Sequence, residues 1–454
     1  MDRHSLLAPT YRFACPECEV AMKNYKFLVP VVLIVLYAAS IYMLNDTKTK
    51  EMNQYNASLS MAREYREMGI QVDAETYYMQ ALEQNPSIDL YMEIGEFYWA
   101  SQQKKEAEEW GNAIIEAYPQ EVRGYEFLMG VYEQREDYVA CFDLADTLTK
   151  RKMNSPVISE ILSRIEYYFY FTGGYEDTGI CSGGLIPVAT EGKWGYVTQN
   201  GGKAVPLTYA YAGPFSEGIA PVIDREGNAY FIDAEGNKKH VVLGVDNVQQ
   251  LGLMERGMFS LYDGAKWSFY NTEHEKVFGD YDEVSSIGNG IAAVKENGKW
   301  HLVDRNGTDL TGKTYHAVAM DEKLVIFRNE RLFVSNGEYY QMITSSGEVI
   351  GDGRYEDVHI FGDTTYAAVK VNGKWGFVDK DGNMVIEPQY EDARSFSNGL
   401  AAVMLNDLWG FIDSSGKVVI APQFEKAWDF NSDGCVFVFI DSEWKLLRLF
   451  KLNH

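Results

Sequence analysis

The sequence predicts a multi-domain protein with three successive parts. The first is a single transmembrane helix, and the second is an α-solenoid of about three helix pairs. The third is an all-β repeat domain of about eight units, which we expect to be propeller-like, with an open β-solenoid as the alternative. Three observations support this prediction: an uncharged run of 18 residues near the N-terminus, a helical pattern with a period of 33 to 34 residues, and a second repeat of about 35 residues.

The composition indicates an acidic, folded chain. It has 454 residues, a formal net charge of −25, 46% hydrophobic residues and 14% aromatic residues. Enough apolar residues are present for packed cores, so global disorder is excluded. The acidic balance argues against a nucleic-acid partner, because phosphate binding needs clustered Lys and Arg. Five cysteines are too few for a disulfide scaffold.

The uncharged run extends from Phe27 to Leu44 and would span roughly 27 Å as a helix. A cleaved signal peptide and a buried core helix are the alternatives to an uncleaved membrane anchor. A small excess of Lys and Arg before the run predicts a single-pass protein of the bacterial cell membrane. The N-terminus would then be cytoplasmic and residues 45–454 extracytoplasmic, with 45–54 as a linker.

The leader, residues 1–26, contains Cys15 and Cys18 in a Cys-Pro-Glu-Cys motif. Such a pair is half of a structural zinc site, which needs four ligands. Two copies of the chain could supply them, so Cys15 and Cys18 are a weak metal candidate. The alternative is a pair of thiols, or one palmitoylated thiol, beside the membrane.

Residues 55–172 carry the helical repeat. Equivalent residues recur at spacings of 33 and 34, namely Tyr65, Tyr98 and Tyr132, then Ala74, Ala107 and Cys141, then Ala81, Ile114 and Leu148. Small residues allow two helices to pack closely, and Pro86 and Pro119 end the second helix of the first two units. The pattern resembles the tetratricopeptide repeat, and residues Ser155 to Phe171 are expected to form a helix that caps the stack.

This resemblance implies a concave face, built from the first helix of each pair, that binds an extended peptide or a partner helix. The residues that would line this groove are Arg63, Arg66, Glu96, Trp99, Arg123, Glu126 and Glu133. The Lys and Asn pattern with which the family holds a peptide C-terminus is absent. The alternative is a rigid spacer with a solvated, charged face.

Residues 175–454 carry the second repeat. Its units begin at Tyr175, Tyr209, Val248, Tyr281, Tyr315, Tyr355, Tyr390 and Phe424, with spacings of 34, 39, 33, 34, 40, 35 and 34. Tryptophan recurs at one place in most units: Trp194, Trp267, Trp300, Trp375, Trp409 and Trp444. Gly follows this Trp in three of the units. The pattern resembles the WG repeat of bacterial proteins, a resemblance that implies architecture more than activity.

Each unit reads as three short strands and a short fourth, joined by Asp- and Gly-containing hairpin turns. A turn such as Asp379 to Asn383 is not a calcium loop, because its Gly is misplaced and its final carboxylate is missing. Eight units favour a closed ring, although no terminal strand clearly completes the last unit. Cys181 and Cys435 lie in the first and last units, and only a ring would bring those units together.

The chain lacks the motifs of nucleophilic, phosphate-binding and metal-dependent enzymes, and no cofactor is implied. The sequence therefore predicts a non-enzymatic, membrane-anchored binding or scaffold protein that presents both repeat surfaces to protein or peptide partners. The alternative is an envelope protein that binds cell-wall or other carbohydrate. The repeated Trp side chains are expected in the core, because they recur with the period of the fold.

Overall fold

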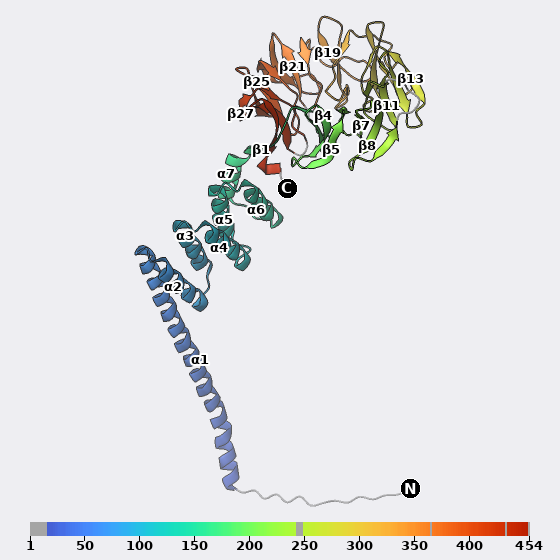
Figure 1. Cartoon of the computed structure of the whole chain (residues 1–454). Helices are drawn as coiled ribbons and strands as arrows, with labels where there is room; N and C mark the ends of the chain where they lie inside the picture. Colours follow the sequence, from blue (N-terminus) through green and yellow to red (C-terminus); the bar gives the residue numbers. More distant parts are fainter. Residues whose placement is uncertain (1–15, 242–247, 364–365, 432–433, 453–454) are drawn as a thin grey trace, which may run out of the picture. The chain divides into compact units, whose positions relative to one another are not determined.

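The structure is a computed structural model and describes residues 16–241, 248–363, 366–431 and 434–452, with side chains in the first helix from Val32 onward. The chain divides between Ile161 and Leu162 into two compact units. The first unit is helical. The second begins within the last helix and is otherwise made of strands (Figure 1).

Seven α-helices occur in the described part of the chain. They are α1 (Pro16–Glu67), α2 (Gln71–Gln84), α3 (Ile88–Ala100), α4 (Lys104–Ala117), α5 (Val122–Gln134), α6 (Tyr138–Lys150) and α7 (Pro156–Ile165). Fully buried small side chains at Ala74, Ala81 and Ala107 let neighbouring helices approach. The side chains of Ser87 and Asp137 cap the N-termini of α3 and α6 by accepting backbone N–H bonds.

The prediction of a transmembrane helix over residues 27–44 is wrong. That run forms part of α1, a single helix of 52 residues. Among the described residues, none of the helices combines the length and the apolar character that crossing a membrane requires. The predicted localisation as a single-pass membrane protein with a cytoplasmic N-terminus depended on this helix and is therefore also wrong.

Eight antiparallel sheets make up the β unit, which is an eight-bladed propeller (Figure 1). Blade 1 contains β2 (Asp177–Thr178), β3 (Leu185–Thr190), β4 (Lys193–Thr198) and β5 (Lys203–Tyr209). Blade 2 contains β6 (Tyr211–Ala212), β7 (Ile219–Ile223), β8 (Ala229–Asp233) and β9 (Lys238–Val241). Blade 3 contains β10 (Gln250–Leu251), β11 (Met258–Tyr262), β12 (Trp267–Asn271) and β13 (Lys276–Tyr281). Blade 4 contains β14 (Glu283–Val284), β15 (Ala292–Glu296) and β16 (Lys299–Val303).

Blade 5 contains β17 (Ala317–Val318), β18 (Leu332–Ser335) and β19 (Tyr340–Ile343). Blade 6 contains β20 (Asp357–Val358), β21 (Ala367–Val371), β22 (Lys374–Val378) and β23 (Met384–Tyr390). Blade 7 contains β24 (Asp392–Ala393), β25 (Leu400–Leu405), β26 (Leu408–Asp413) and β27 (Val418–Phe424). Blade 8 contains β28 (Lys426–Ala427), β29 (Cys435–Ile440) and β30 (Glu443–Leu449). In blades 4 and 5 the outer strand is reduced to isolated bridges, such as Trp300 with Tyr315.

The ring closes through a strand that the sequence did not reveal. The segment β1 (Phe169–Tyr175) precedes the first repeat, yet it pairs antiparallel with β30 and completes blade 8. The last blade therefore combines residues from both ends of the β unit and has four strands. This pairing decides for the propeller and against the open β-solenoid.

Candidate functional site

The loops that follow the first, two-residue strand of each blade meet at the centre of the ring. The clearest sign is a hydrogen bond of 3.1 Å from the Nζ of Lys323 to the Oγ of Ser182. Lys323 belongs to blade 5 and Ser182 to blade 1, and these blades face each other across a ring of eight. Side chains from opposite blades can touch only at the axis, so the contact locates the central region of the propeller.

Blade 5 supplies an unusually long loop to this centre. Thirteen residues separate β17 from β18, whereas six separate β24 from β25 in blade 7. We call residues 319–327 the central loop. The extra length accounts for the 40-residue spacing between Tyr315 and Tyr355, where neighbouring units have 34 or 35. That spacing was the signal in the sequence from which a blade-specific insertion could have been inferred.

A tight turn shapes the central loop. The Oδ1 of Asp321 accepts the backbone N–H groups of Lys323, at 2.9 Å, and Val325, at 2.8 Å. Leu324 takes a left-handed conformation, with φ of 59°. Blade 4 holds the loop from the side, because Ser286 donates its N–H to the Leu324 carbonyl and its Oγ to the Lys323 carbonyl. The loop is therefore fixed across the ring rather than projecting freely.

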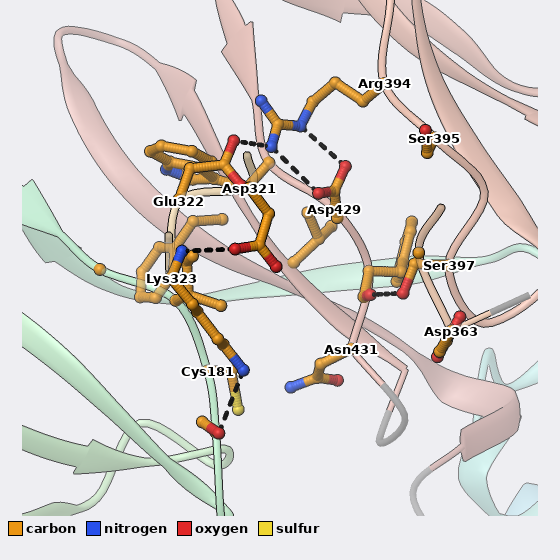
Figure 2. A pocket seen from close by; sticks show the side chains of 18 of the residues that line it. Cys181, Asp321, Glu322, Lys323, Asp363, Arg394, Ser395, Ser397, Asp429 and Asn431 are labelled. Atoms are coloured by element: carbon orange, nitrogen blue, oxygen red, sulfur yellow. Dashed lines mark hydrogen bonds and ion pairs between the residues drawn. The ribbon is translucent and has the colours of Figure 1, made fainter. Parts of the chain in front are cut away.

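One side of the central loop borders a cavity of about 320 Å³, which we call the axial cavity. Blades 1, 6, 7 and 8 supply the rest of its wall. Figure 2 shows Arg394 in this cavity, with the guanidinium forked onto the carboxylate of Asp429 at 2.7 and 3.0 Å and also bonded to Glu322. The same guanidinium lies 4.9 Å from the ring centroid of Trp428. Arg394 thereby links blades 5, 7 and 8.

Burial and neighbouring charges shift the titration of the groups in this cavity. Burial acts against the charged form of Arg394, but Asp429 and Glu322 outweigh it and raise the pKa of the guanidinium. Burial and the nearby Arg328 lower the pKa of Lys323. Burial and Arg394 likewise lower the pKa of His359. The guanidinium charges are neutralised locally, since Arg328 is itself paired with Asp321 at 2.6 Å.

A second cavity, of about 430 Å³, lies against the central loop and blades 2 to 4. We call it the Trp267 cavity. Its apolar lining is Tyr211, Pro214, Leu251, Leu253, Trp267 and Leu324, and amides enter from Gln249 and Gln250. Tyr211 and Leu324 are 40% and 37% exposed, although both are large hydrophobic residues. This combination of apolar wall and polar amides is typical of a binding site.

Only part of the predicted helical groove is free to bind a ligand. Arg63 on α1 forms a bidentate pair with Glu93 on α3, with distances of 2.8 and 2.7 Å. Arg123 on α5 bonds Asp89 on α3 at 2.7 Å. These pairs join α3 to α1 and to α5, the first helices of the neighbouring pairs. Their charge, however, is already engaged within the protein.

The remaining predicted groove residues differ in their surroundings. Glu126 accepts a 2.6 Å hydrogen bond from Ser155, and Arg66 hydrogen-bonds the hydroxyl of Tyr78. Trp99 packs against the helical core, while Glu96 is exposed. Glu133 is half-buried and has an interaction partner. Trp99 and Glu96 are therefore the groove residues most available to a partner.

The repeated Trp side chains belong mostly to the blades. Trp300, Trp375, Trp409 and Trp444 are buried, with exposed fractions of 4 to 9%. Trp194 and Trp267 are half-buried. Of the six, Trp267 lines the binding cavity defined above. Sequence periodicity could not separate it from the others, because all six share one position in the repeat.

The weak metal candidate falls outside the described side chains. Cys15 is outside the described residues, and Cys18 lies in the part of α1 for which no side chains are described. Among the residues that are described, no group of three or more His, Cys, Asp or Glu side chains is arranged to hold a metal ion.

Comparison with protein families identifies the repeat of the β unit. The family described as "WG containing repeat" matches five segments, residues 194–225, 267–300, 342–375, 375–409 and 409–444. These segments run from blade 1 into blade 2, from blade 3 into blade 4, and from blade 5 through to blade 8. The chain is thus similar to WG-repeat proteins over a large part of the propeller.

Comparison with solved structures finds propeller-length matches of low identity. A eukaryotic initiation factor matches with 14% identity and a TM-score of 0.42, covering 61% of this chain and 85% of that chain. Hsv2 of Kluyveromyces lactis matches with 10% identity and a TM-score of 0.37, covering 53% and 94%. BamB of Moraxella catarrhalis matches with 13% identity and a TM-score of 0.33, covering 61% and 83%. None of the curated proteins matches this chain.

Proposed function

We propose that this chain is a non-enzymatic binding and scaffold protein whose propeller binds an extended segment of a partner protein at the Trp267 cavity. The observation that carries the proposal is the cavity itself, where two exposed hydrophobic side chains, Tyr211 and Leu324, stand beside Trp267. Aromatic and apolar side chains in a concave, partly exposed site are typical of protein-binding surfaces.

The size and lining of the cavity support a peptide ligand. A volume of about 430 Å³ lies within the range of sites that hold compact apolar groups. The amides of Gln249 and Gln250 supply both donors and acceptors, which match the alternating N–H and C=O groups of an extended backbone. An apolar partner side chain would enter between Trp267 and Leu324, while the amides bond the flanking backbone.

The axial cavity supports binding rather than catalysis as the role of the ring centre. Arg394 is held by two carboxylates and Arg328 by a third. A cation fixed in this way fastens blades together, and it is not available to stabilise charge that develops in a transition state. We therefore assign these ion pairs to the integrity of the surface that carries the Trp267 cavity.

The helical unit would supply a second surface in this scaffold. Trp99 and Glu96 lie on α3, the helix that also carries the ion-pair partners of Arg63 on α1 and Arg123 on α5. A partner helix or peptide on this side would contact Trp99 and displace little internal charge pairing. A Trp99→Ala variant removes the indole contact, and an Arg63→Ala variant removes a positive charge. Loss of partner binding in Trp99→Ala but not in Arg63→Ala would show that the indole contact, rather than electrostatic attraction, holds the partner.

Leu324→Asn tests the Trp267 cavity. Asn removes the apolar side chain but accepts the left-handed backbone at this position, so folding is retained. Peptides would first be selected from a displayed library on the full chain, and their affinities measured by titration calorimetry. We expect binding about tenfold weaker in the variant.

Leu310→Asn is the matched control, because Leu310 is also exposed but lies outside the lining of both cavities. It should bind the selected peptides as the unaltered chain does. Equal affinities for the unaltered chain, Leu310→Asn and Leu324→Asn would disprove the assignment of the site.

A specific observation also favours carbohydrate as a second candidate. Trp267 and Tyr211 present aromatic rings next to the two Gln amides, and sugars bind through ring stacking combined with hydrogen bonds to their hydroxyl groups. Titration of the full chain with a glycan panel, followed by Trp fluorescence, distinguishes the candidates. A response that disappears in Tyr211→Ala supports carbohydrate, and a flat response across the panel rejects it.

A further inference from the structure

Two cysteines lie together where the ring closes. Cys181 follows the first strand of blade 1, and Cys435 begins β29 in blade 8, 254 residues later. Both pack in one cluster between the two blades, and both line the axial cavity. Neither cysteine is part of a disulfide. A pair so distant in sequence is brought into contact only by the tertiary structure.

The two thiols differ in access. Cys181 is half-buried in the wall of the axial cavity, and Figure 2 shows its sulfur beside the end of the Lys323 side chain. Cys435 is buried, and its Sγ accepts a hydrogen bond of 3.0 Å from the Nδ2 of Asn431. A positive charge next to a thiol favours the thiolate, which is the reactive form. Cys181 is therefore placed to react first.

We propose that Cys181 and Cys435 form a redox-reactive pair that becomes a disulfide by exchange with a low-molecular-weight disulfide. The pair is a covalent modification site at the junction of blades 1 and 8.

The reaction proceeds through two exchanges. The Cys181 thiol first loses its proton to solvent. The resulting thiolate attacks one sulfur of the small disulfide and displaces a first thiolate, which leaves a mixed disulfide on Cys181. The Cys435 thiolate, formed by loss of its own proton, then attacks the Cys181 sulfur and displaces the second thiolate. Two protein thiols are oxidised to one disulfide, and the small disulfide is reduced to two thiols that take up the two protons.

The order of attack follows from the environment of each sulfur. The neighbouring Cys181 thiol and burial raise the pKa of Cys435, so its thiolate is scarce in the reduced pair and Cys435 reacts second. Burial raises the pKa of Cys141, in the helical unit, to about 12. It lies in α6 rather than in this cavity and should remain reduced.

The new bond would lock the ring shut. Blade 8 is already completed by pairing between β1 and β30, which is non-covalent. A disulfide between blades 1 and 8 closes a very long loop, so it restricts the unfolded chain strongly. Oxidation should therefore slow the opening of the propeller and raise its thermal midpoint.

The experiment uses the full chain with Cys15→Ser and Cys18→Ser, which leaves three cysteines of the five. The reduced protein is incubated with 2-hydroxyethyl disulfide, and free thiols are counted in denaturant. We expect three before and one after, a Cys181–Cys435 linked peptide in the digest, and a higher thermal midpoint that dithiothreitol reverses.

A Cys435→Ser variant is the comparison. It should stop at a mixed disulfide on Cys181 and show no rise in thermal midpoint. The proposal is overturned if the protein with both cysteines retains three free thiols, or if it accumulates the mixed disulfide on Cys181 without forming the linked peptide. Both measurements are made on the unaltered pair, so they stand even where the variant folds poorly.

Discussion

Gly410, the glycine after the repeated Trp, is required by backbone contact. A Cβ at this position would lie 2.6 Å from the carbonyl oxygen of Ile420 and 2.7 Å from the nitrogen of Pro422. Gly376 meets the same arrangement, at 2.5 Å from the Ile386 oxygen. The neighbouring strand approaches here across an irregular register, so no flexible side chain can yield. Gly is therefore required at these two positions because the neighbouring backbone leaves no room for a side chain.

Gly410→Ala should therefore destabilise the propeller by about 2 kcal/mol, because the clash is with backbone atoms. Gly130→Ala in α5 is the control: a methyl group at this position would meet nothing within 4 Å, and helix propensity favours Ala by about 1 kcal/mol. Denaturant unfolding, followed by Trp fluorescence and by circular dichroism, measures both. An unaffected propeller in Gly410→Ala would contradict this account of the WG pair.

At the scale of the element, the hairpin turns show how one short sequence serves several blades. In the turn after β22, the Oδ1 of Asp379 accepts the N–H groups of Asp381 and Asn383, both at 2.9 Å. Its Oδ2 accepts the side-chain amide of Asn383 at 3.0 Å. Asp224 and Asp413 make similar bonds in their own turns. The carboxylate thus organises a turn, in keeping with the rejection of a calcium loop.

These turns predict a loss of stability in acid. Burial acts to raise the pKa of Asp379, but the hydrogen bonds from Asn383 and Asp381 outweigh it and lower the pKa below the ordinary value. A lowered folded-state pKa contributes stability above the unfolded value of about 3.9, and this contribution is lost as the pH falls through the folded value.

Asp379→Asn keeps an acceptor oxygen but cannot ionise, so it isolates this effect. The unaltered chain should have the higher thermal midpoint at neutral pH, and the difference should shrink below about pH 4. Thermal melts across this range check the prediction. A difference that is constant with pH would show that the carboxylate charge does not stabilise the turn.

The central loop could be predicted only in part from the repeat pattern. The 40-residue spacing of the fifth unit signalled extra residues, but not where they would go. Leu324 keeps a left-handed conformation, although it is not Gly, because the Asp321 side chain and blade 4 hold the turn. Only contacts with other blades place this loop at the ring centre.

At the scale of the whole molecule, Arg394 connects blades that are not adjacent in sequence. Its side chain is only 13% exposed and bonds Glu322 of blade 5 and Asp429 of blade 8. Such a partly buried network gives modest net stability, yet removing one partner leaves charged groups without compensation. The network is therefore costly to break.

Arg394→Met should destabilise the propeller by about 2 kcal/mol. The loss would be larger if the carboxylates of Glu322 and Asp429 were fully buried, but both retain some contact with water. Arg354→Met is the matched control. Its guanidinium also lies 4.9 Å from an aromatic centroid, that of Tyr339, but Arg354 is less enclosed and lies outside the axial cavity. Urea unfolding of both variants gives the comparison, and equal losses would mean that stacking, rather than the cross-ring ion pairs, carries the effect.

The sequence alone determined the repeat periods, the short strands, the hairpin turns and the identity of the WG positions, because these depend on residues close together in one unit. It did not determine ring closure by β1, the contact between Cys181 and Cys435, or the cavities beside the central loop. Each of those joins residues from distant units, and the direction in which units stack decides which of them meet. The prediction of a transmembrane helix failed for a related reason. Hydropathy describes only the residues of the apolar run, whereas in the structure this run is one part of the 52-residue helix α1.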